Sequence, residues 1–181
     1  MKVISGLYKG RNIIGYDLDG TRPTMDRVKE SLFAMIQDYV KDAVILDLFS
    51  GSGNLGIEAL SNGAKEAYLV DYNRKAYNTI KTNIDNLGIN NASILNMDYK
   101  EALTNLNKTD KKFDVIFLDP PYKTDYIEKS ITLIDKYKLL TSNGIIVCEN
   151  ESLDRIVYPI NFKAIKDKKY GNKWVVILKQ L

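Results

Sequence analysis

Along the chain, short continuous apolar runs typical of buried strands alternate with segments whose apolar residues recur at helical spacing. Short apolar runs rich in β-branched and aromatic residues, each closed by Gly, Asp or Asn, predict strands over residues 43–49, 66–70, 92–95, 113–118 and 144–149. The segments between them have helical spacing and predict helices over residues 54–61, 73–87, 99–106 and 125–139. Because strands and helices alternate, the pattern predicts an α/β fold with a mostly parallel sheet that is covered on both faces.

The two ends of the chain depart from this rhythm. Residues 3–6 and 9–14 predict a small β-hairpin, and a helix follows over about residues 25–39 with Thr24 as its N-cap. Residues 162–166 and 174–179, joined across residues 170–172, predict a terminal antiparallel hairpin. No repeat or linker divides the 181 residues, so we expect one domain over residues 1–181, with an extension at 1–40 and a core at 41–181.

Composition excludes several kinds of chemistry. The chain has no histidine and one cysteine, Cys148, which lies in an apolar run. The usual zinc ligand sets and the histidine-dependent nucleophilic mechanisms are therefore excluded, we expect no metal, and Cys148 is expected in the core. No apolar run approaches the ~20 residues of a membrane span, and no signal peptide is recognisable, so a cytoplasmic location is expected.

Charge is distributed unevenly, although the net charge is only +3. Residues 1–29 carry six basic and three acidic side chains, residues 163–181 carry six basic and one acidic, and the segment between them is net acidic. This distribution suits a polyanion bound by the two ends and a cationic or neutral ligand bound by the middle.

The glycine loop (residues 49–53) lies between a predicted strand and a predicted helix. Gly51 and Gly53 let the backbone lie against a ligand, and Gly56 allows the helix to pack closely on the strand. The Gly-x-Gly-x-x-Gly spacing alone is shared with dinucleotide-binding folds. Asp47, just before the loop, favours instead a ligand that bears an ammonium group, such as the amino acid end of S-adenosylmethionine.

Two more aspartates follow successive strands in the order that this ligand requires. Asp71 ends the second predicted strand and could accept hydrogen bonds from a ribose diol, whereas Asp98 could accept one from an adenine amino group. The predicted cofactor-binding residues are Asp47, Phe49, Ser50, Gly51, Ser52, Gly53, Asp71, Met97, Asp98 and Asp119.

The predicted catalytic residues form a turn, Asp119-Pro120-Pro121-Tyr122, at the end of the fourth predicted strand. The two prolines stiffen the backbone. The carboxylate of Asp119 and the carbonyl of Pro120 could both accept hydrogen bonds from one NH₂ group and aim its nitrogen at a sulfonium methyl, while Tyr122 stacks on the base. An aryl amine becomes cationic as it takes up the methyl, so two fixed acceptors stabilise the transition state more than the ground state.

Together with these motifs, the N-terminal stretch resembles a known family. The sequences ISGLYKGR (4–11), TRPTMDRVKESLF (21–33), FSGSG (49–53) and GIEALS (56–61) resemble the RsmD family of bacterial small-subunit rRNA guanine-N2 methyltransferases. The resemblance covers essentially the whole chain and implies a Rossmann-like class I methyltransferase fold, with seven strands of which the last is antiparallel. Two positions depart from the family pattern: Ser50 where alanine is common, and Asp71 where glutamate is frequent.

The resemblance also implies a substrate and a partner: a guanine of 16S rRNA within the 30S subunit or a late assembly intermediate. It places Arg22, Thr24 and Arg27 near the cofactor or substrate, and we add Arg11 because arginine binds phosphate through two parallel hydrogen bonds. The lysines of the two ends, at positions 2, 9, 29, 163, 166, 168, 169 and 173, could neutralise phosphates around a flipped-out base. No apolar helix is left over for a partner surface, so we expect a monomer.

Other activities remain open from the residues alone. The Asp-Pro-Pro-Tyr chemistry would also suit the N6 amine of adenine in DNA or a protein glutamine, and a non-catalytic RNA-binding assembly factor could retain the same fold. A nicotinamide dehydrogenase is disfavoured, because neither Asp47 nor the Asp-Pro-Pro-Tyr turn has a role in hydride transfer.

Overall fold

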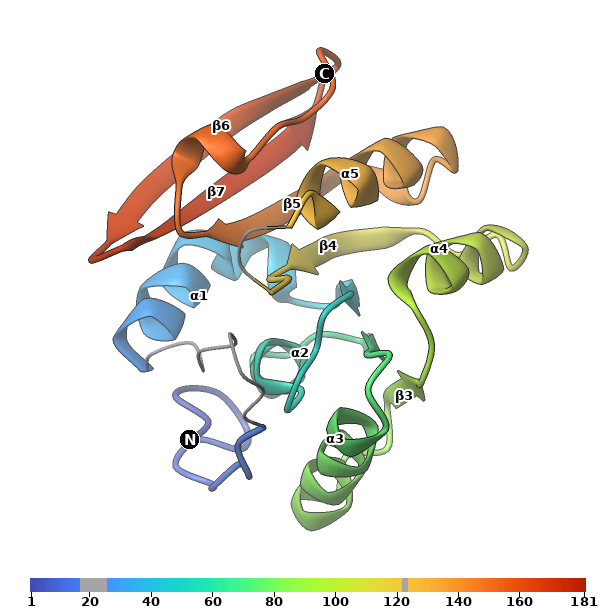
Figure 1. Cartoon of the computed structure of the whole chain (residues 1–181). Helices are drawn as coiled ribbons and strands as arrows, with labels where there is room; N and C mark the ends of the chain where they lie inside the picture. The colour runs from blue at the N-terminus through green and yellow to red at the C-terminus, as the bar shows by residue number, and fades with distance from the viewer. Residues whose placement is uncertain (17–25, 122–123) are drawn as a thin grey trace.

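A seven-stranded sheet forms the centre of the molecule (Figure 1) in the computed structural model, which describes residues 1–16, 26–121 and 124–181. Its strand order is β3-β2-β1-β4-β5-β7-β6. The strands are β1 (Val44–Asp47), β2 (Glu66–Val70), β3 (Ala92–Leu95), β4 (Phe113–Leu118), β5 (Leu140–Asn150), β6 (Phe162–Tyr170) and β7 (Lys173–Gln180). The pairs among β1–β5 are parallel, and β7 is antiparallel to both β5 and β6. Six strands thus share one direction and the last runs against them, which confirms the predicted fold class.

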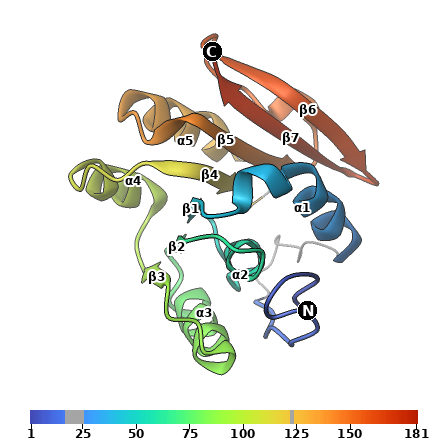
Figure 2. The ribbon, with the colours of Figure 1, turned by 180° about the vertical axis from the view of Figure 1, so that it is seen from behind.

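Helices cover both faces of this sheet (Figures 1 and 2). They are α1 (Asp26–Val40), α2 (Asn54–Ser61), α3 (Arg74–Leu87), α4 (Tyr99–Asn107) and α5 (Tyr126–Lys136), with a short 3₁₀ helix, η1 (Leu153–Arg155). Buried residues of α1, α2 and α3 share one apolar cluster with one face of the sheet. Buried residues of α4 and α5 share a second cluster with the other face. The strand order changes direction between β1 and β4, and such a reversal opens a ligand-binding crevice at the carboxyl ends of the strands.

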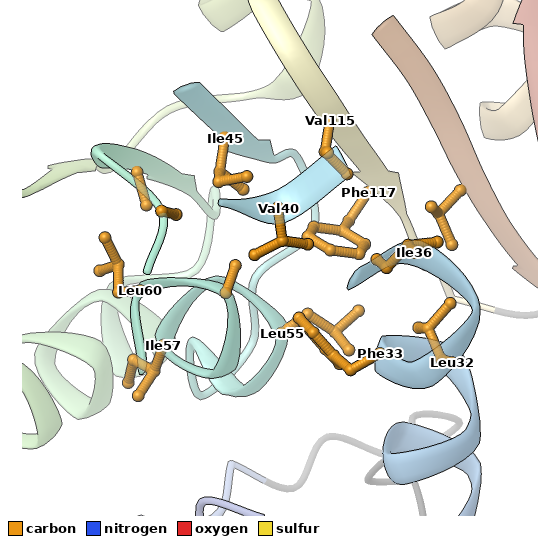
Figure 3. Close-up of a cluster of buried hydrophobic side chains, with 14 of the residues drawn as sticks. Leu32, Phe33, Ile36, Val40, Ile45, Leu55, Ile57, Leu60, Val115 and Phe117 are labelled. Atoms are coloured by element: carbon orange, nitrogen blue, oxygen red, sulfur yellow. The ribbon is translucent and has the colours of Figure 1, made fainter. Parts of the chain in front are cut away.

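The first cluster holds α2 against β1 and β2 and α1 against β4 (Figure 3). Phe33 of α1 meets Phe117 of β4 with ring centroids 5.9 Å apart. Leu55 and Ile57 of α2 point into the same cluster. Because these side chains interlock, the first turn of α2 is held at the carboxyl end of β1.

The predicted N-terminal hairpin is present as a short antiparallel pairing of residues 1–3 with residues 10–13, in which Val3 donates to the carbonyl of Arg11 and Ile13 to that of Met1. Residues 1–16, called the N-terminal segment below, make a single isolated antiparallel bridge between Lys2 and Asn12. The amide groups that would continue a ladder are used elsewhere: Ile4 and Ser5 donate to the carboxylate of Glu58, and Leu7 donates to the carbonyl of Ser61. The segment is therefore docked on α2, and its backbone groups are satisfied there.

Two further boundaries differ from the prediction. Helix α5 ends at Lys136 instead of residue 139, because Lys138 adopts a left-handed conformation (φ 51°) and turns the chain. Strand β5 begins at Leu140, four residues earlier than predicted, and its pairing with β4 is irregular between Leu140, opposite Phe113, and Ile145, opposite Val115. The C-terminal hairpin is present as predicted, although β6 continues through the polar residues 167–170 to its end at Tyr170. None of the helices in the described part of the chain is long and apolar enough to cross a membrane.

Gly56 lies where α2 crosses the sheet, as its place in the sequence predicted. A Cβ at this position would lie 2.1 Å from Leu69 Cδ2 and 3.4 Å from Asp47 Oδ2. Any side chain would push α2 away from β1 and β2.

We expect Gly56→Ala to lower the free energy of unfolding by at least 1–3 kcal/mol, roughly the cost of an overpacked core position. Gly15→Ala is the matched control, because a Cβ there would meet only Met1 Cε at an ordinary 3.8 Å. Urea denaturation of both variants measures the difference. Equal stabilities would show that the helix can move aside without cost.

Candidate active site

One pocket of about 310 Å³ opens at the carboxyl ends of β1, β2, β3 and β4. It brings together ten of the residues predicted for cofactor binding or catalysis: Asp47, Phe49, Ser50, Gly51, Ser52, Asp71, Met97, Asp98, Asp119 and Pro121. Gly53 and Pro120 are neighbours of these residues in the sequence. Both are buried, but neither lines the pocket. Residues far apart in the sequence therefore meet at one place.

The glycine loop has the backbone conformation that its glycines permit. Gly51 has φ 55° and Gly53 has φ 80°, a left-handed region that other residues rarely adopt. The amide of Gly53 donates to the carbonyl of Ser50 at 2.7 Å, which closes a tight turn before α2 begins at Asn54. The loop backbone thereby forms one wall of the pocket.

Two aspartates flank this loop. Asp71 accepts from the amide of Gly51 through Oδ2 and from the amide of Asn73 through Oδ1, both at 2.9 Å. Asp47 is 1% exposed and accepts from the amide of Gly56 at 3.0 Å. Burial raises the pKa of Asp47 to about 7, and the nearby charge of Asp71 adds to this rise. Burial also raises the pKa of Asp71. A cationic ligand group would stabilise the ionised form of both carboxylates.

The third aspartate has a structural role as well. Asp98 caps α4, because its Oδ1 accepts from the amide of Lys100 at 2.8 Å. It lines the pocket beside Met97. Asn96 ties this turn to the end of β2 by donating to the carbonyls of Asp71 and Tyr72, at 2.9 and 3.0 Å.

The catalytic turn begins directly after β4. Asp119 and Pro121 line the pocket, and Pro120 is buried between them. The hydroxyl of Thr124 donates to the carbonyl of Pro121 at 2.9 Å. Tyr122 lies outside the described residues, so its stacking role stays a prediction.

An aromatic wall that the sequence did not reveal completes the pocket. Tyr99, the first residue of α4, and Tyr126, the first of α5, lie with ring centroids 5.1 Å apart. Phe49 lies 5.4 Å from Tyr99 and stacks on Tyr126 at 6.0 Å. The other lining residues that were not predicted are Met1, Tyr16, Leu48, Asn54, Leu55 and Tyr72. Tyr99 and Asn54 each directly follow a predicted site residue, whereas nothing in the pattern pointed to Tyr16.

Three buried polar atoms in this pocket have no hydrogen-bond partner among the described residues: the hydroxyls of Tyr16 and Tyr99 and the Nδ2 of Asn54. Burial, assisted by the nearby charges of Asp71 and Asp98, raises the pKa of Tyr16 and of Tyr99 to about 12, so both phenols keep their protons. Buried polar groups are nearly always paired in folded proteins. Their concentration in one pocket indicates a site built for a polar ligand.

The residues predicted to contact RNA are not gathered at this pocket. Arg11 is exposed and donates to the carbonyl of Asn86 at 2.9 Å, and Arg27 is exposed on α1. Arg22 and Thr24 lie outside the described part of the chain. The prediction was wrong for Lys29 and Lys173, which are buried and pair with Glu58 and Glu149, so their charges are already used inside the protein.

Comparison with known proteins gives matches along nearly the whole chain. The family model described as "Conserved hypothetical protein 95" matches residues 1–179. YlbH of Bacillus subtilis is 45% identical over an alignment of 182 positions that covers 99% of this chain and 99% of YlbH. Ribosomal RNA small subunit methyltransferase D of Escherichia coli is 32% identical over 172 residues, or 94% of this chain and 85% of that protein. The solved structure of yhhF from Escherichia coli has a TM-score of 0.87 at 28% identity and covers 99% of this chain and 97% of its own.

The raised pKa of Asp47 predicts a pH-dependent stability. In the unfolded chain this carboxyl ionises near its ordinary value of 3.8, and in the folded protein at about 7. Between these values the unfolded state binds fewer protons, so the free energy of unfolding falls as pH rises and levels off above about pH 7. Asp47→Asn removes this slope, up to roughly 1.4 kcal/mol per pH unit.

We therefore expect the stability of the wild type relative to Asp47→Asn to decline from about pH 4 to about pH 7. Denaturant titrations of both proteins across this range measure the difference, and the contribution of Asp71 cancels if it is the same in both. A difference that does not vary with pH would show that Asp47 is already ionised in the folded state.

Proposed function

The chain belongs to the RsmD family of small-subunit ribosomal RNA methyltransferases, and we propose that it transfers a methyl group from S-adenosylmethionine to the exocyclic N2 amine of a guanine in 16S rRNA. The observation that carries this proposal is the single pocket in which the glycine loop, Asp47, Asp71 and Asp119 meet three unpaired buried polar atoms. Membership in the family supplies the class of substrate, and the pocket supplies the class of chemistry.

The lining residues fit S-adenosylmethionine in charge and shape. Asp47 would hold the ammonium of the amino acid end, and Asp71 the ribose hydroxyls, which can donate to oxygens that already accept backbone amides. Met97 and Asp98 would contact the adenine, and the aromatic wall would cover its apolar faces. When bound, this cofactor supplies a methyl group that is electrophilic because it is attached to a positively charged sulfur.

The residues of the catalytic turn would prepare the attacking amine. Asp119 and the carbonyl of Pro120 accept its two hydrogens, hold the nitrogen in line and stabilise the positive charge that develops on it. The nitrogen held there would take up the methyl group that the cofactor supplies, and the methylated amine would then release one proton to solvent. The two prolines keep both acceptors in place without reorganisation.

The basic ends of the chain would hold the RNA around this pocket. Arg11 and Arg27 are exposed and could contact phosphates at a distance from the reacting base. The N-terminal segment is fastened to α2 and also contributes Met1 and Tyr16 to the pocket. We propose on this basis that residues 1–181 work as one domain.

The substrate assignment predicts labelling of one guanine N2 when the protein is incubated with labelled S-adenosylmethionine and 30S subunits that lack small-subunit guanine-N2 methylation. Nucleoside analysis and mapping of the modified position measure it. Plain DNA and a release-factor protein, offered in parallel, should remain unlabelled. Labelling of DNA or protein alone would replace the rRNA assignment with an adenine N6 or glutamine amine.

The proposed role of Asp119 predicts a kinetic defect in Asp119→Asn. This change keeps the size of the side chain but replaces one acceptor oxygen with a donor, so we expect kcat to fall about 10²-fold or more. Asp110→Asn is the matched control, because Asp110 is exposed and its left-handed backbone (φ 53°) suits asparagine equally well. The rates of single-turnover methylation of 30S subunits by Asp119→Asn and Asp110→Asn measure the difference. Equal rates would remove Asp119 from the reaction.

A further inference from the structure

Among the unpaired polar groups of the pocket, Asn54 is the one whose orientation is fixed by its surroundings. Lys29 is 0% exposed and its Nζ lies 2.7 Å from Lys2 O, 2.7 Å from Asn54 Oδ1 and 2.9 Å from Glu58 Oε2. An ammonium group has three donors and no acceptor, so the three oxygens satisfy it. The amide of Asn54 must therefore present its oxygen to Lys29, which turns the NH₂ group away from the cation.

The NH₂ group of Asn54 is a donor left without an acceptor. Asn54 lines the pocket, is 6% exposed, and its Nδ2 has no hydrogen-bond partner in residues 1–16, 26–121 and 124–181. Leaving a buried amide donor unpaired destabilises the protein. A ligand that supplies an acceptor here would remove that destabilisation.

The surroundings of Asn54 indicate what this acceptor is. Asn54 is the first residue of α2, and the N-terminus of a helix favours negative charge. Two residues further on, Gly56 donates to Asp47, so the cation-binding carboxylate lies against the same helical turn. An anion-binding donor and a cation-binding carboxylate at adjacent points match an α-amino acid group, in which carboxylate and ammonium share one carbon.

Other donors for such a carboxylate are few. No lysine or arginine lines the pocket within residues 1–16, 26–121 and 124–181. The amino terminus of Met1, which also lines it, donates to the carbonyl of Ile13 at 3.3 Å. Among the described side chains that line the pocket, the donors available to the anion are therefore neutral, and the NH₂ of Asn54 is a buried and oriented one.

We propose that Asn54 binds the carboxylate of the amino acid end of the cofactor through Nδ2, and that Lys29 is the positioning residue that orients its amide. This proposal rests on the function proposed above. Lys29 also pairs with Glu58, which holds the amides of Ile4 and Ser5. The same buried ammonium thus connects the N-terminal segment to the amino acid end of the pocket.

Calorimetric titration with two probes tests the proposal. S-adenosylhomocysteine carries the α-amino acid group, whereas 5′-methylthioadenosine has the same adenosine and thioether sulfur without it. In Asn54→Asp the acceptor for Lys29 is retained, the NH₂ donor is lost, and a negative charge faces the ligand carboxylate. We expect the Kd of S-adenosylhomocysteine to rise about 10- to 100-fold, the range for a hydrogen bond to a charged group, and the Kd of 5′-methylthioadenosine to change less than about twofold.

The matched control is Asn78→Asp, which makes the same chemical change at an exposed position of α3 and should leave both affinities unaltered. If Asn54→Asp does not fold, Asn54→Ala should show the same selective loss for S-adenosylhomocysteine. Unchanged binding of S-adenosylhomocysteine, or an equal loss for both probes, would overturn the role of Asn54. A wild-type protein that binds neither probe would overturn the proposed function itself.

Discussion

The buried ion pair between Lys29 of α1 and Glu58 of α2 is the interaction on which the arrangement of the site depends. Both side chains are 0% exposed, and removing two charges from water costs several kcal/mol unless hydrogen bonds satisfy them. Lys29 meets three oxygens, and Glu58 accepts from the amides of Ile4 and Ser5 and from the hydroxyl of Ser5. These hydrogen bonds form only when α1, α2 and the N-terminal segment are all in place. The ion pair therefore specifies one arrangement of these three parts, whereas apolar packing alone is compatible with several arrangements.

A second set of hydrogen bonds, centred on Asn83, connects the N-terminal segment to the pocket. Asn83 of α3 is buried, accepts from the amide of Ile14, and donates to the carbonyls of Ile14 and Ser52 at 3.0 Å. The N-terminal segment is thereby clamped to the glycine loop, and the ring of Tyr16 approaches Gly51, where an added Cβ would lie 3.6 Å from its Cδ1. The extension that the sequence set apart from the core is, in the structure, part of the wall of the site.

The sequence predicted those features that repeat locally. Alternating apolar runs predicted the parallel sheet, and glycines beside an aspartate predicted the loop and the order of Asp47, Asp71 and Asp98 along the sheet edge. Prediction from the sequence failed where side chains from distant segments form hydrogen bonds or ion pairs with one another. The apolar alternation of the N-terminal segment predicted a longer hairpin than the one present, because the amides of Ile4 and Ser5 bond to Glu58. Lys173 resembled a surface lysine because its partner, Glu149, lies 24 residues away. The spacing of apolar residues along the chain gives no information on contacts between distant residues. The contributions of Tyr16 and Asn54 to the pocket were missed for the same reason.

The charges of the pocket also bear on the direction of the proposed reaction. Asp47, Asp71, Asp98 and Asp119 line it, and no basic side chain does so within the described residues, so the site favours a cationic ligand over a neutral one of the same shape. S-adenosylmethionine has one more positive charge than the product left after methyl transfer, because the sulfur becomes neutral. The carboxylates that attract the cofactor therefore lose part of their attraction once the methyl group has left, whereas the contacts to its amino acid end do not change. On the proposed function, the acidic edge of the sheet would distinguish cofactor from product by charge, and the neutral donors around Asn54 would hold both.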